Sequence, residues 1–113
     1  MVMKDFAQAR PEVLKKFLRA IDRATDFIGK HKEESQAIVA ERLELDKEVA
    51  TTLWDDFIFG ISLDHSLLIT LEAEARWAIK NEFTNKTEVP NYLDYIYFDA
   101  LEEVKPEVIG IIR

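Results

Sequence analysis

The sequence predicts a mainly α-helical fold, with about five helices and at most one or two short strands, in a single helical domain over residues 1–113. Two long segments, residues 11–29 and 64–83, carry apolar residues at intervals of three and four, which is the period of one helix face. The chain contains only three Gly and three Pro, too few for a turn-dense β-sandwich or barrel. A length of 113 residues with 48% apolar residues is typical of one globular domain.

The first predicted helix covers residues 11–29. Pro11 suits its first position, because the N–H that proline lacks would be unpaired there in any case, and Gly29 suits its end. Its apolar face is formed by Leu14, Phe17, Leu18, Ile21, Ala24 and Ile28. Charged residues fill the opposite face, so we expect this helix to pack one side against a core.

Three further segments follow this helix. A helix over residues 33–43 would need tertiary packing, because a helix of that length is marginal in water. A third helix over residues 47–58 follows Asp46, whose carboxylate can accept a hydrogen bond from an early backbone N–H. Residues 59–63 alternate apolar with small or polar side chains, which favours a short extended segment or strand.

The second long helix covers residues 64–83, with Asp64 as its N-cap and an apolar face of its own. Residues 84–90 are composed like a loop. The aromatic-rich residues 92–98 show no single period, so we expect a loop or short turn packed on the core.

The C-terminal residues are expected to form two short helical turns followed by an apolar end. Asp99 can cap a short helix that reaches Val104, and Pro106 can begin a last turn. The very apolar residues 108–112 need a surface to pack against. The predicted core consists of Leu14, Phe17, Leu18, Ile21, Leu53, Phe57, Leu68, Leu71 and Ile79.

Charge and composition exclude several classes of function. A net charge of −7 and a pI near 4.8 would repel a phosphate backbone on average, so we expect no nucleic-acid partner. The absence of Cys excludes thiolate metal sites and a thiol nucleophile. The first residues lack a basic region followed by an apolar one, so the chain as written predicts no secretory signal.

Histidine and serine offer weak candidates for chemistry. A metal site would need His31 or His65 together with converging carboxylates, and neither His lies in a metal-binding pair. We expect both at the surface or near helix ends. A triad of Ser62 or Ser66 with His65 and Asp64 is unfavourable, because residues adjacent in the chain rarely point at one reacting atom.

Acidic and aromatic residues offer two more candidates. Paired carboxylates could serve glycosidic chemistry, but Glu72 and Arg76 at i,i+4 favour a salt-bridged surface. The acidic pairs are Glu33–Glu34, Asp55–Asp56, Glu72/Glu74 and Glu102–Glu103. An enzyme would need a pocket that joins His65 with Glu72 or Asp55, so we expect no enzyme, no catalytic or metal-binding residue and no cofactor. Trp54, Phe57, Phe59 and Trp77 could line an apolar ligand pocket, although core packing is favoured.

Several stretches carry a resemblance to a known family. They read ARPEVLKKFLRA at 9–20, ATDFI at 24–28, SQAIVA at 35–40, ISLDHSLL at 61–68, LEAEARWAI at 71–79, VPNY at 89–92 and DALEEVKP at 99–106. In order and spacing, the chain resembles the C-terminal third of the periplasmic solute-binding proteins of ABC importers. The subgroup is the one for nitrate, sulfonates, taurine and thiamine precursors.

The resemblance implies a role as a non-catalytic part of a larger protein. Family members are about three times as long, with two α/β lobes that close over a small anionic or organic solute. This chain would be a C-terminal fragment holding helices that wrap the first lobe. It would have no catalysis of its own, and no ligand-binding residue is assigned because the ligand contacts lie mostly upstream.

The resemblance also implies a location and partners. The parent would be periplasmic or attached to the cell envelope, would bind a small solute and would meet the permease of an ABC transporter. Surface meant for the missing lobe would be exposed, so we expect self-association, driven by the apolar residues 108–112. The alternative is a free-standing helical protein-interaction module whose acidic surface meets a basic partner. The identity of the ligand, and a transport or sensor role, stay open.

Overall fold

The computed structural model describes all 113 residues and is mainly helical, which confirms the predicted class. It contains α1 (Lys4–Ala9), α2 (Pro11–Lys30), α3 (Lys32–Arg42), α4 (Lys47–Leu53), α5 (His65–Lys80) and α6 (Asp99–Val104). Three short 3-10 helices complete it, η1 (Trp54–Asp56), η2 (Tyr92–Tyr95) and η3 (Pro106–Val108). No strand is formed, and α1 was not predicted because six residues are too few to show a period.

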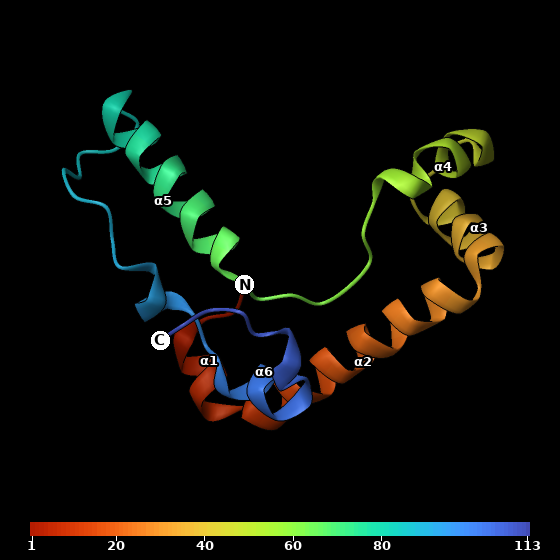
Figure 1. Ribbon diagram of the computed structural model, residues 1–113, viewed down its shortest axis with the longest axis horizontal. Coiled ribbons are helices and arrows are strands. Elements are labelled where there is room, and N and C mark those ends of the chain that lie inside the picture. Colours follow the sequence, from red (N-terminus) through yellow and green to blue (C-terminus); the bar gives the residue numbers. More distant parts are fainter. The chain divides into compact units, whose positions relative to one another are not determined.

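The chain divides into two compact units. Unit 1 comprises Met1–Lys15 and Ser62–Arg113, and unit 2 comprises Lys16–Ile61. Helix α2 begins in unit 1 and ends in unit 2 at Lys30, and Figure 1 draws it as one unbroken helix. A single domain over residues 1–113 stays a prediction.

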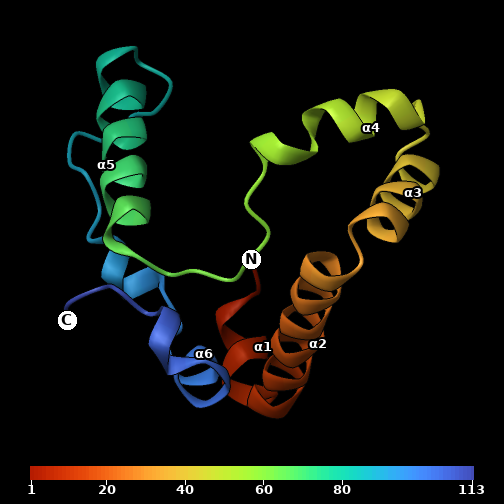
Figure 2. The ribbon, with the colours of Figure 1, turned by 45° about the vertical axis from the view of Figure 1, so that its right-hand side comes forward.

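Unit 1 has a small hydrophobic core around α5. Leu68, Phe98 and Ile111 are buried together, and the chain that follows α5 runs back beside it in both views (Figures 1 and 2). Leu63 and Ile109 form an isolated parallel bridge, in which Gly110 N–H donates to the Leu63 carbonyl at 2.8 Å. The apolar C-terminus therefore packs within unit 1, and Ile112 alone of its large side chains is exposed.

Unit 2 is built on α3 and α4, which lie side by side in both views (Figures 1 and 2). Ala40, Ala50 and Trp54 are its buried apolar residues. Helix α2 differs from these elements, because none of its residues is buried and no other element packs extensively along it. Unit 2 thus has a thin core, and its long helix is at most partly buried.

Helix boundaries differ from the predictions at two C-termini. Helix α4 ends at Leu53 rather than residue 58, because η1 follows and Phe57 is already extended. Helix α5 ends at Lys80 rather than residue 83, where Glu82 has a φ of 58° and Phe83 N–H donates to the Ala78 carbonyl. This left-handed closure satisfies the last carbonyls of a helix and is usually made by glycine. The sequence does not predict this helix end, because glutamate rather than glycine occupies the left-handed position 82.

The structure also tests the two predicted N-caps, Asp46 and Asp64, and the predicted strand over residues 59–63. The Asp64 carboxylate accepts a hydrogen bond from Ser66 N–H at 3.0 Å, as an N-cap should. Asp46 occupies the same position before α4 but makes no such bond. Residues 59–63 form no strand, and their one bridge is at Leu63.

Of the predicted core, Leu68 is buried, whereas Phe17, Ile21, Leu53 and Phe57 are exposed and were wrongly placed there. The remaining predicted positions are partly buried, namely Leu14, Leu18, Leu71 and Ile79. Phe17 is 62% exposed and Phe57 61% exposed. Periodicity identifies the apolar face of a helix, but it does not supply the neighbour that would cover that face.

The two units leave an unusual amount of surface uncovered. Together they expose 9245 Å², whereas two separate compact domains of these lengths would expose about 7,700 Å². No side chain is less than 2% exposed. The chain therefore buries less of its surface than two compact domains of the same lengths would.

Candidate functional site

The two histidines lie apart from any metal site. His31 joins α2 to α3, where its ring stacks on Phe27 with centroids 4.5 Å apart and its Nδ1 lies 4.0 Å from Glu34. His65 is the exposed first residue of α5. No group of three His, Asp or Glu side chains is placed to hold a metal ion.

The Ser, His and Asp residues near the start of α5 form a helix cap. The Ser66 hydroxyl and backbone N–H both donate to the Asp64 carboxylate. These bonds, the hydroxyl first and then the N–H, lower the pKa of Asp64 below its ordinary value because they favour the charged form. The Ser66 hydroxyl therefore serves the cap rather than an imidazole.

Three of the four acidic pairs contact Lys or Arg side chains on the surface. Glu72 accepts from Arg76 at 3.5 Å, which is the expected i,i+4 pair, and Asp55 accepts from Lys32 at 2.7 Å. In unit 1, Glu102 pairs with Arg113 and Glu103 with Lys15. Lys15 also donates to Glu12, and these two carboxylates, Glu103 first, raise its pKa. This is the pattern of a salt-bridged surface.

Three of the four aromatic residues singled out from the sequence meet in unit 2. Trp54 and Phe59 have ring centroids 4.7 Å apart, and Phe57 and Phe59 6.2 Å apart. They line a hollow of about 340 Å³ whose other walls come from the end of α2 and the start of α3. Trp77 lies elsewhere, in unit 1, where it stacks on Phe83 at 5.1 Å.

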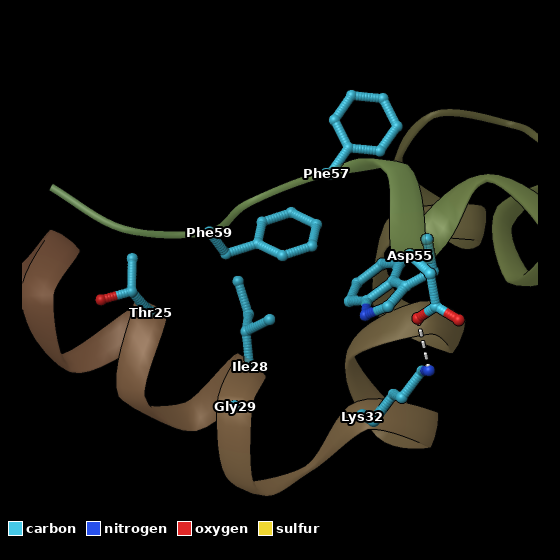
Figure 3. Close-up of a pocket in the computed structure, with 8 residues that line it drawn as sticks. Thr25, Ile28, Gly29, Lys32, Asp55, Phe57 and Phe59 are labelled. Carbon is cyan, nitrogen blue, oxygen red and sulfur yellow. Dashed lines mark hydrogen bonds and ion pairs between the residues drawn. The ribbon is translucent and has the colours of Figure 1, made fainter. Parts of the chain in front are cut away.

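Figure 3 shows how the walls of this hollow are arranged. Ile28 points from α2 toward Phe59, while the Phe57 ring points away from α2 (Figure 3). The Lys32 ammonium and the Asp55 carboxylate close one end with their ion pair. Sequence reasoning missed the α2 and α3 side of the hollow, and the one signal for it was Ile28 at the end of the apolar face of α2.

The hollow offers apolar contacts rather than groups for catalysis. Its aromatic walls are open, since Phe57 is 61% and Phe59 38% exposed. Its one carboxylate is paired with its one ammonium, and neither Ser nor His lines it. The hollow can receive an apolar side chain or a small apolar group.

The larger candidate site is the uncovered apolar surface itself. In unit 2 it includes Phe17, Ile21, Phe57 and Ile58, of which Ile58 is 99% exposed. Exposed apolar surface is typical of an interface with other protein where it is contiguous. None of the helices combines the length and hydropathy needed to span a bilayer.

Comparison with known proteins adds no relative. No protein-family model, curated protein or solved structure matches the chain.

Proposed function

We propose that the chain is a non-catalytic part of the substrate-binding protein of an ABC importer for a small anionic or organic solute. Its role is to cover and complete a lobe of that protein, which the solute and the transporter permease then contact. The family resemblance of the sequence supplies this identity. The uncovered apolar surface supports the idea that these helices pack on protein outside the chain.

The observation that carries the proposal is the surface area. The chain exposes 9245 Å², about 1,500 Å² more than two compact domains of the same lengths. Helix α2 makes the point locally, because it is amphipathic over 20 residues and yet buries none of them. A helix of this kind is stabilised mainly by packing its apolar face.

The helix order gives a second line of support. A Pro-led helix is followed by a shorter helix, by a third helix and then by an extended segment, here α2, α3, α4 and residues 57–63. The resemblance leads us to expect this order in the C-terminal third of the family. A full binding cleft would come from the upstream lobes, so no residue of this chain is assigned to ligand.

The proposal is tested in cells of the source organism. An antibody raised against the 113-residue chain is used on fractionated cells, and the detected band is digested for peptide mass spectrometry. We expect peptides of this chain within a polypeptide about three times as long, in the periplasmic or envelope fraction. A band of 13.1 kDa alone, outside that fraction, would contradict the proposal and favour the free-standing interaction module with an acidic surface.

A further inference from the structure

The hollow of unit 2 is lined by a hydrogen-bond donor that has no partner. Trp54 is 7% exposed, yet its indole N–H, which can only donate, makes no hydrogen bond. No fully enclosed side-chain nitrogen or oxygen of the chain lacks a partner, so this N–H retains an opening to solvent. The hollow is the cavity that Trp54 lines. A nearly buried donor without a partner favours a ligand that brings an acceptor.

The ion pair at one end of the hollow adds one charge of each sign. Lys32 donates to Asp55 at 2.7 Å, both side chains are more than half exposed, and Figure 3 shows them at the same end. An ammonium has three N–H donors and a carboxylate has two oxygens, so each group keeps the capacity for a further partner. A ligand with a single charge would meet one attractive and one repulsive group, whereas a zwitterion can match both.

The other walls of the hollow are mostly apolar and leave room for a small group. Ile28 points toward Phe59 (Figure 3), and Gly29 beside them has no side chain. A volume of about 340 Å³ lies at the lower end of the range of ligand pockets, which suits a molecule of amino-acid size. All eight lining residues belong to unit 2, so the whole arrangement lies within one unit.

We propose that the hollow binds a free α-amino acid with an apolar side chain. The carboxylate of the amino acid accepts from the Lys32 ammonium and the Trp54 N–H, and its ammonium donates to Asp55. Its side chain lies against Phe59 and Ile28. This ligand gives the unpartnered donor an acceptor and matches both charges at the end of the hollow. The inference rests on the hollow alone and goes beyond the proposed function, which assigns no ligand to this chain.

The first test measures binding through the fluorescence of Trp54. The chain has two Trp, so Trp77→Phe, a change in unit 1, leaves Trp54 as the only one. The probes are L-phenylalanine and two molecules that each lack one of its charges, phenylpropionate without the ammonium and phenylethylamine without the carboxylate. We expect L-phenylalanine to bind about tenfold more tightly than either. No binding up to about 10 mM L-phenylalanine, or equal binding of either single-charge molecule, would overturn the proposal.

Variants of the two charged residues test their roles separately in the Trp77→Phe background. Lys32→Met and Asp55→Asn should each weaken the binding of L-phenylalanine about tenfold, since each removes one charge-assisted hydrogen bond. The matched control is Lys30→Met, which makes the same charge change as Lys32→Met outside the hollow and should leave the affinity within twofold. Circular dichroism of every variant checks that the helices are kept. A control as damaging as Lys32→Met, or unchanged affinity in Lys32→Met, would contradict the proposal.

The second test follows the Trp54 N–H itself. In the Trp77→Phe chain, the indole region of a proton–nitrogen correlation spectrum contains a single signal, because one Trp remains. We expect saturating L-phenylalanine to shift this signal, since the N–H gains a carboxylate acceptor. Phenylethylamine, which brings no acceptor, should shift it much less. An indole signal that stays in place when L-phenylalanine is bound would overturn the proposal.

Discussion

The two units of this chain bury their apolar residues to different degrees. Unit 1 brings Leu68, Phe98 and Ile111 together from three separate segments, and the chain end closes over them. In unit 2, α3 and α4 pack on each other, while α2 has no fully buried residue. Long-range packing thus supports unit 1, whereas the longest helix of unit 2 has no fully buried residue.

The strongest way to test this comparison is to remove one phenylalanine from each unit. Phe98 is 7% exposed, and the Arg113 guanidinium lies 4.2 Å from its ring centroid, so Phe98→Ala leaves a cavity in the unit 1 core. We expect a loss of about 3 kcal/mol in the free energy of unfolding. Urea unfolding followed by circular dichroism measures it.

The matched control for this experiment is Phe57→Ala in unit 2. Phe57 is 61% exposed and points away from α2 (Figure 3). Its removal should change the unfolding free energy by less than about 0.5 kcal/mol. Equal losses for the two variants would mean that unit 2 has a core comparable to that of unit 1.

The next prediction compares the two aspartates that precede helices. Asp64 caps α5 in unit 1 through Ser66, whereas Asp46 precedes α4 in unit 2 with no side-chain bond. We expect Asp64→Ala to lower the melting temperature by about 5 °C and Asp46→Ala to lower it much less. Thermal unfolding at neutral pH measures both changes.

The cap also predicts a pH dependence with a definite sign. The pKa of Asp64 is lowered in the folded state, by the Ser66 hydroxyl first and the Ser66 N–H next. Its contribution is therefore complete above the unfolded pKa, near 4 for Asp, and is lost as pH falls through the folded pKa. Asp64→Asn keeps the cap and should remove this part of the acid dependence. An unchanged acid profile would show that Asp64 does not contribute to it.

A smaller effect is expected from the glycines of the two units. A Cβ added to Gly29, near the end of α2, would meet no atom within 4 Å. Gly29→Ala should therefore stabilise the chain by about 0.5 kcal/mol, because alanine loses less backbone entropy in a helix. At Gly110 in unit 1 the added Cβ would lie 3.4 Å from the Asp64 Cβ, which should offset the gain. Urea midpoints of the two variants test this order.

The sequence predicts the elements of this protein better than its packing. The spacing of apolar residues was sufficient to predict the helices α2 and α5, because each carries a long apolar face. It could not show which faces are covered, so Phe17 and Leu53 were wrongly placed in the core. Phe98 and Ile111 were not predicted as core, because they lie in segments without a period and are brought to Leu68 by long-range folding.

In the candidate site, too, the sequence indicates some residues but not the neighbours that folding brings to them. Trp54, Phe57 and Phe59 could be singled out, because aromatic residues so close in the chain commonly cluster. Their partners Ile28 and Lys32 lie more than twenty residues earlier, and only the turn from α2 through α3 and α4 brings them near. The uncovered stripe of α2 was visible in the sequence, but its lack of a neighbour was not.

The smallest expected effect concerns the ion pairs of the two units. Lys32 and Asp55 at the end of the hollow are 53% and 81% exposed, so Lys32→Met should change the unfolding free energy by less than about 0.5 kcal/mol. The Lys15 side chain is only 16% exposed and holds two carboxylates, so Lys15→Met should lower the melting temperature more. Thermal unfolding of both variants with and without 1 M salt gives the comparison. If Lys32→Met were the more damaging change, the Lys32–Asp55 ion pair rather than the burial of Trp54 would hold η1 against α3. The two units would then differ in the kind of interaction that stabilises them and not in how well they are packed.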